Sequence, residues 1–210
     1  MPIMTRIPLL AGLLILSSAA LAETADTAQS LAQPCAACHG QKGQGGMGAY
    51  PHLAGLGETY LKRQLDAFAS GQRDNPIMKP MASGLSDAQR ATLARYFSKQ
   101  SPAAPGSNPP ADNGAGAELV RHGRWQDDIP ACVQCHGPDA RGIGKDFPGL
   151  AGQPAGYLQD QLKAWRNGKR QGDPQGLMSA VAKRLDDADL AAVADYLASL
   201  SAAPGQEGQP

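Results

Sequence analysis

All four cysteines of this chain lie in two copies of one pentapeptide, CAACH at residues 35–39 and CVQCH at residues 132–136. The spacing C-x-x-C-H is typical of the attachment site of c-type haem. Two thiols at this spacing can form thioether bonds to one porphyrin, and the next histidine can then bind the iron. The motifs therefore predict two covalently bound haem c groups. The attachment residues are Cys35, Cys38, Cys132 and Cys135, and the axial iron ligands are His39 and His136.

Three other uses of a C-x-x-C pair fit these residues less well. A zinc site needs four ligands, and the chain has no further cysteine to complete one. A thioredoxin-like redox pair requires a βαβ pattern around it, which the sequence lacks. A structural disulfide would leave the histidine at the same offset in both copies unexplained. Haem attachment accounts for all six residues.

Each predicted iron needs a sixth ligand, because an open position favours ligand binding or catalysis over electron transfer. Methionine sulfur is a soft donor suited to iron. Met78 and Met178 are the methionines that an internal repeat relates to each other, each seven residues before an equivalent leucine. We therefore predict His39 with Met78, and His136 with Met178, as the axial pairs.

Other candidate ligands have no residue of their own type at the matching position. They are Met47, Met81, His52 and His122. Val181 matches Met81, and Gly149 matches His52. We interpret Met47 as a loop side chain and both histidines as surface residues.

The internal repeat extends well beyond the cysteines. PHLAG at residues 51–55 recurs as PGLAG at residues 148–152, which is 97 residues later, and Tyr60 recurs as Tyr157. After an insertion around residues 172–176 the offset becomes 100, which relates Tyr96 to Tyr196. A repeat of this length indicates a duplicated domain. Repeated prolines between the copies exclude a regular helix and predict a linker.

The elements that must position these residues are predicted to be helices. Leu61, Leu65 and Phe68 recur at helical spacing, and the second copy repeats the pattern. Ser86 and Gln89 form a capping box before the last helix of the first copy, and Asp186 is the corresponding cap in the second copy. The fold class is therefore all-α. We expect a signal peptide at 1–22, haem domains at 23–100 and 116–203, a linker at 101–115 and a polar tail at 204–210.

The N-terminus predicts export to the periplasm. Arg6 precedes an apolar stretch, and Ala20-Leu21-Ala22 is a small-x-small cleavage site. The apolar stretch is shorter than the roughly 20 residues of a membrane-spanning helix. The whole chain has 19 basic and 19 acidic side chains and no basic patch, so nucleic-acid binding is not expected.

These residues resemble the dihaem cytochrome c4 family, in which two class I cytochrome c domains stand in tandem. The resemblance covers nearly the whole chain after the N-terminal segment and includes Gly55, Gly152 and the segments that follow Met78 and Met178. It implies that the carbonyls of Pro51 and Pro148 accept a hydrogen bond from the axial histidines. It also implies a periplasmic electron carrier, soluble or loosely attached to the membrane surface. Such a carrier takes electrons from a quinol-oxidising complex or a dehydrogenase and passes them to a terminal oxidase.

Two alternative functions remain at this stage. Instead of a free electron carrier, the chain could be a dihaem subunit of a sulfur-oxidising or other periplasmic dehydrogenase complex. It could also be a dihaem peroxidase. A peroxidase needs a displaceable ligand on one haem, which the matched methionines argue against. We further expect the second haem to have the lower reduction potential. The reason is that Asp127, Asp128, Asp139 and Asp146 surround its motif, whereas the first copy carries the cations Lys42, Lys62, Arg63, Arg73 and Lys79.

Overall fold

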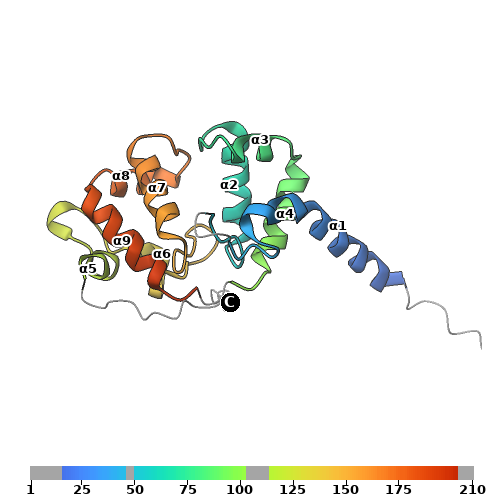
Figure 1. Cartoon of the computed structure of the whole chain (residues 1–210), viewed down its shortest axis with the longest axis horizontal. Coiled ribbons are helices and arrows are strands. Elements are labelled where there is room, and N and C mark those ends of the chain that lie inside the picture. The colour runs from blue at the N-terminus through green and yellow to red at the C-terminus, as the bar shows by residue number, and fades with distance from the viewer. Residues whose placement is uncertain (1–15, 46–49, 103–113, 203–210) are drawn as a thin grey trace, which may run out of the picture.

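The computed structural model describes residues 16–45, 50–102 and 114–202. We refer to residues 16–102 as the first half and to residues 114–202 as the second half. Both halves consist of helices (Figure 1), and the described residues contain isolated β-bridges but no strand. The helices of the first half are α1 Leu16–His39, α2 Glu58–Ser70, α3 Met78–Ser83 and α4 Asp87–Ser98. Those of the second half are α5 Ala115–Arg121, α6 Cys132–His136, α7 Ala155–Arg166, α8 Leu177–Ala182 and α9 Asp187–Ser199. Three short 3-10 turns, η1 Trp125–Asp127, η2 Pro138–Ala140 and η3 Pro174–Gly176, complete the second half. The predicted all-α class is confirmed.

The core of the first half lies where α2 packs on α4. Tyr60, Leu61, Leu93 and Phe97 are buried there. Helix α4 begins at the predicted capping box, in which the Gln89 amide donates to the Ser86 hydroxyl (3.2 Å) and the Gln89 side chain accepts from the Ser86 amide (2.9 Å). These bonds satisfy amides that a helix start leaves without partners. The cap thus fixes where α4 begins, just after the segment that carries Met78.

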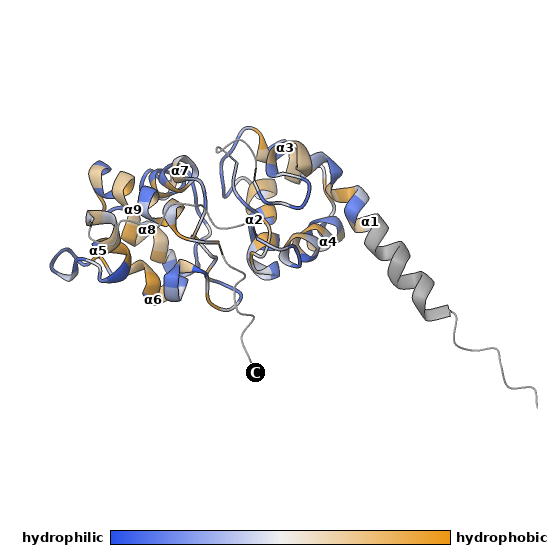
Figure 2. Cartoon of the chain, turned by 60° about the horizontal axis from the view of Figure 1, so that its bottom comes forward, coloured by the Kyte–Doolittle hydropathy of each residue, from blue (hydrophilic) through white to orange (hydrophobic). Residues whose placement is uncertain are grey.

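The core of the second half is built in the same way from α5, α7 and α9. Leu158, Leu190, Val193 and Leu197 are buried in it. Helix α9 begins at Asp186, whose carboxylate accepts from the Asp189 amide at 2.7 Å. Figure 2 shows hydrophobic and hydrophilic residues interspersed along the helices of both halves. The predicted cap at Asp186 is confirmed, and so is the predicted apolar face of α7, where Leu158 and Leu162 are buried.

The two halves differ before the C-x-x-C-H motif. In the first half α1 continues directly through Cys35 and Cys38, whereas in the second half residues 122–131 separate α5 from α6. Arg124 and Ile129 close this segment through two backbone hydrogen bonds, of 2.7 and 3.1 Å. The segment is fastened to the helical core because the Arg124 guanidinium donates to both carboxylate oxygens of Asp189, at 3.0 and 2.6 Å.

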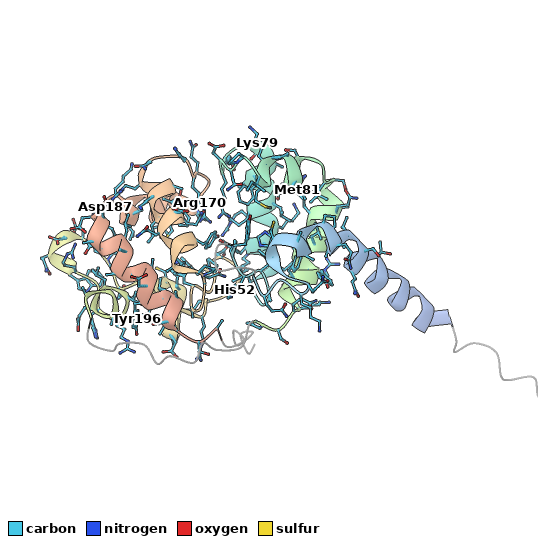
Figure 3. All side chains as sticks on the ribbon, viewed as in Figure 1. His52, Lys79, Met81, Arg170, Asp187 and Tyr196 are labelled. Atoms are coloured by element: carbon cyan, nitrogen blue, oxygen red, sulfur yellow. The ribbon has the colours of Figure 1, made fainter. Side chains whose placement is uncertain are left out.

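The halves lie side by side and share an extended contact (Figure 1). The Asp74 amide donates to the Lys169 carbonyl (3.0 Å), and the Gln171 amide donates to the Gln72 carbonyl (2.7 Å). His52 is also part of this contact, because its backbone amide and carbonyl both bond to the Gln153 side chain, at 3.0 and 2.9 Å. His52 is half-buried at this contact, so it is only in part the surface residue that the sequence suggested. Figure 3 shows His52 between the halves.

Several predicted segments lie wholly or partly outside the described residues. These are the signal peptide up to residue 15, the linker from 103 to 113 and the polar tail. In the part of the chain that the structure describes, no helix is long and apolar enough to cross a membrane.

Candidate haem sites

A cavity of about 450 Å³ lies beside the second C-x-x-C-H motif. Cys132, Cys135, His136 and Met178 all line it, as the sequence predicts for one haem site. Its apolar wall comes from α7, α8, α9 and the residues between them: Leu158, Leu162, Val181, Leu185, Val193 and Leu197. The first half also contributes lining residues, namely Leu56, Tyr60, Arg63 and Gln64. Residues of the first half therefore complete the wall of this cavity in the second half.

His136 is oriented for metal binding. Its Nδ1–H donates to the Pro148 carbonyl at 2.8 Å, so the proton is on Nδ1 and the lone pair is on Nε2. Only 6% of the residue is exposed, and burial lowers the pKa of the imidazole. Nε2 is buried and has no hydrogen-bond partner among the described residues. A buried polar atom without a partner calls for an explanation, and a bound iron supplies one.

His39 repeats this geometry in the first half. Its Nδ1–H donates to the Pro51 carbonyl at 2.9 Å, and burial lowers the pKa of its imidazole as well. The Tyr50 ring stands edge-on to His39 at 6.2 Å, as the Phe147 ring does to His136 at the same distance. The expected hydrogen bonds to the two proline carbonyls are confirmed. The two halves therefore hold their histidines by the same local design.

The first cysteine of each motif lies in an environment that does not favour thiolate chemistry. Burial raises the pKa of Cys132 to about 11 and raises the pKa of Cys35. A redox-active or metal-binding cysteine needs a lowered pKa, because the thiolate is the reactive form. Cys35 packs against the core of the first half, and Cys132 packs against that of the second.

The predicted methionines occupy equivalent places. Met178 lies in the first turn of α8 and lines the cavity, and Met78 is the first residue of α3 and is half-buried. The Met78 amide donates to the Asn75 side chain at 2.8 Å, which fixes the start of α3. By contrast, Met81 is 43% exposed and His122 is exposed. Met47 lies outside the described residues.

A crossed arginine network joins the halves, and sequence reasoning did not find it. Arg73 donates to Gln64 of its own half (3.0 Å) and to Tyr157 (3.0 Å) and Gln161 (2.5 Å) of the other. Arg170 donates to Gln161 of its own half (3.1 Å) and to Tyr60 (3.2 Å) and Gln64 (2.8 Å) of the other. Each residue and its counterpart are 97 positions apart. The shared offset of 97 residues and the polarity of these side chains are the sequence features that could have indicated the network.

Among the described residues, the two arginines of the network have no acidic partner. Arg73 is 6% exposed and Arg170 is 4% exposed, and the side chains they bond to among the described residues are neutral. Buried cations are normally paired with anions. Arg170 lines the cavity and is visible between the halves in Figure 3. The carboxylates of haem propionates fit this position, so the residues present fit the cofactor at both its iron and its acidic edge.

Comparison with known proteins agrees with this geometry. The family model described as Cytochrome c matches residues 25–101 and again residues 116–201. The thiosulfate dehydrogenase electron acceptor of Thiomonas intermedia is 49% identical over 178 residues, covering 82% of this chain and 81% of the relative.

Two solved structures are also similar. Cytochrome c4 from Pseudomonas stutzeri has a TM-score of 0.76 at 35% identity, covering 84% of this chain and 98% of that one. A thiosulfate dehydrogenase from Marichromatium purpuratum has a TM-score of 0.76 at 40% identity, covering 86% of this chain and 40% of that one. The two tandem matches, the two histidine sites and the likeness to cytochrome c4 lead to one conclusion. The chain belongs to the cytochrome c family, as a cytochrome c4-like electron-transfer protein that carries two covalently bound haem c groups.

Proposed function

We propose that this chain is a periplasmic electron carrier in which each half attaches one haem and supplies both axial ligands of its iron. Cys35 and Cys38 attach the first haem, with His39 and Met78 on its iron. Cys132 and Cys135 attach the second, with His136 and Met178 on its iron. The duplicated bond from histidine Nδ1 to a proline carbonyl carries this proposal, since it leaves Nε2 of both rings as a metal donor.

Each bound iron would supply a one-electron change of oxidation state, and the protein sets the reduction potential at which this change occurs. The proline carbonyls hold the histidine rings in one tautomer and strengthen them as donors. The apolar walls around His136 exclude water, and Met/His ligation raises the reduction potential. Arg73 and Arg170 compensate the propionate charges where the halves meet.

The donor that we favour is a periplasmic dehydrogenase that oxidises thiosulfate. The name of the Thiomonas relative describes an acceptor for such an enzyme, and 40% of the solved thiosulfate dehydrogenase chain matches this fold. The acceptor that we propose is a terminal oxidase. A quinol-oxidising complex remains the alternative donor, and stable association with the dehydrogenase remains the alternative to free diffusion. Export by the N-terminal segment places the carrier in the periplasm.

Stopped-flow mixing of the oxidised holoprotein with a thiosulfate dehydrogenase and thiosulfate tests the donor. We expect both haems to be reduced within the turnover time of the enzyme, and to be reoxidised when a membrane fraction containing terminal oxidase is added. Reduction by a quinol-oxidising complex alone would favour the alternative donor. Size-exclusion chromatography of the mixture distinguishes a diffusing carrier from a stable subunit.

A further inference from the structure

Residues 143–147 of the second half form a tight loop that leads directly into the Pro148 carbonyl. The Ile143 amide donates to the Phe147 carbonyl at 3.0 Å, and the Phe147 amide donates back at 3.4 Å. The Phe147 ring stands edge-on to the His136 ring, at 6.2 Å and 83°. The position of this loop therefore determines where the hydrogen-bond acceptor of His136 lies.

The first half holds this loop. One nitrogen of the Arg63 guanidinium donates to the Asp146 carboxylate at 2.9 Å, and the other donates to the Asp146 backbone carbonyl at 3.0 Å. A Cβ on Gly57 would lie 3.7 Å from the carbonyl oxygens of Gly144 and Lys145, which is van der Waals distance. Arg63, within α2, thus contacts the loop, and Gly57, just before α2, lies beside it.

This contact cannot exist in the opposite direction. At the offset of 97 residues, Arg63 corresponds to Asp160 and Asp146 corresponds to Ala49. The second half therefore has no arginine at the matching position, and the first half has no carboxylate there. The bond from histidine to proline carbonyl is duplicated, but the Arg63–Asp146 pair has no counterpart at the matching sequence positions.

We propose that Arg63 is a positioning residue for the second haem. By holding the loop at residues 143–147, it keeps the Pro148 carbonyl against His136, and so the packing of one half on the other lowers the reduction potential of one haem. A firm hydrogen bond to Nδ1–H makes the imidazole a stronger donor, which stabilises ferric over ferrous iron. The inference rests on the proposed ligand role of His136.

The variant Arg63→Lys tests this, because lysine keeps the positive charge but loses the planar fork that reaches both acceptors. In the holoprotein we expect the potential of the second haem to rise and that of the first to stay unchanged. In the ferrous protein, NMR should show faster solvent exchange of the His136 Nδ1–H and unchanged exchange of the His39 Nδ1–H. Ligand variants at Met78 and Met178 assign each potential to its half.

Arg166→Lys is the matched control within the second half. Arg166 also donates to a carboxylate and a carbonyl, those of Asp187 (2.6 Å) and Leu185 (3.3 Å), but it does not contact the loop. We expect its effect on the second potential to be smaller than that of Arg63→Lys. Equal shifts in the two variants, a shift of both haems together, or faster His136 exchange without a change in potential would each overturn the proposal. Failure of the proposed ligand role of His136 is distinguishable from failure of this proposal. If His136 were not an iron ligand, the wild-type holoprotein would not show the expected low-spin haem spectrum.

Discussion

At the scale of single residues, the chemistry of this protein depends on how two histidines are held. Each Nδ1–H is bonded to a proline carbonyl, which leaves Nε2 as a neutral donor in a buried site. Cys35 and Cys132, four residues before these histidines, are half-buried, and burial raises the pKa of both thiols, which does not suit free thiolate chemistry. We propose that these side chains together form an attachment and ligand set for one haem in each half.

The two methionines can be tested separately. Met78→Ala and Met178→Ala should each remove about half of the charge-transfer band that marks methionine on ferric haem, and each should lower one reduction potential, because methionine ligation raises it. Absorption spectroscopy of the oxidised proteins measures the band. Met81→Ala is the control, and its exposed side chain should leave the band unchanged. Loss of the band in Met81→Ala and not in Met78→Ala would show that the ligand in the first half is misassigned.

At the scale of elements, helix caps and one arginine position the ligand segments. Ser86 and Asp186 start the last helix of each half, just after the segments that carry the methionines. In the second half, Arg124 also ties residues 122–131 to α9 through Asp189. The segment that precedes the second motif is therefore held by the same residue that completes a helix cap.

Asp189→Asn should lower the free energy of unfolding by about 1–2 kcal/mol at pH 6, because it weakens both a charge-assisted hydrogen bond and a helix cap. The hydrogen bonds from Arg124 lower the pKa of Asp189 in the folded state. Its charged form thus stabilises the fold above the unfolded pKa near 3.9, and this stabilisation is lost as the pH falls through the folded value. Urea unfolding of the wild type and of Asp189→Asn at pH 6 and below pH 3 measures the difference in unfolding free energy and its dependence on pH. A difference that does not shrink in acid would contradict the role of the charge.

At the scale of the whole molecule, the two halves complete each other. The cavity beside the second C-x-x-C-H motif is lined in part by residues of the first half. Arg73 and Arg170 each bond to side chains of both halves. We expect Arg170→Gln to lower the free energy of unfolding by about 1–3 kcal/mol, because Tyr60 and Gln64 lose buried hydrogen bonds. It should also lower the reduction potentials, since a positive charge near the haems favours ferrous iron. Chemical unfolding and redox titration of the holoprotein check the two effects, and an unchanged potential would argue against a propionate at this position.

The expected order of the two potentials needs a different reason from the one that the sequence suggested. Each of the four acidic residues near the second motif is paired with an arginine: Asp127 with Arg124, Asp128 with Arg184, Asp139 with Arg141 and Asp146 with Arg63. Two of the cations assigned to the first haem, Arg63 and Arg73, face the second half instead. The lower potential of the second haem stays a prediction, now based on the hold that Arg63 has on the loop beside His136.

These outcomes show which features a single sequence carries. The cysteines, histidines and methionines could be proposed as haem residues because haem chemistry requires fixed residue types at fixed spacing, and the duplication favoured Met78 over Met81. The caps at Ser86 and Asp186 depend on neighbours three residues away, so they too were readable. The contacts between the halves were not, because Arg73 meets Tyr157 and Arg63 meets Asp146 through packing at long range, with no local pattern to mark either contact. The backbone contact of His52 with Gln153 was not predictable for the same reason.

Reductive titration with electron counting tests the central claim, that each motif holds one covalent haem of an electron carrier. We expect the purified wild-type chain to take up two electrons per molecule and the variant carrying both Cys132→Ala and Cys135→Ala to take up one. The thioether bonds of the remaining haem should survive acid extraction. Uptake of a single electron by the wild type, or of two electrons by the variant, would contradict the account.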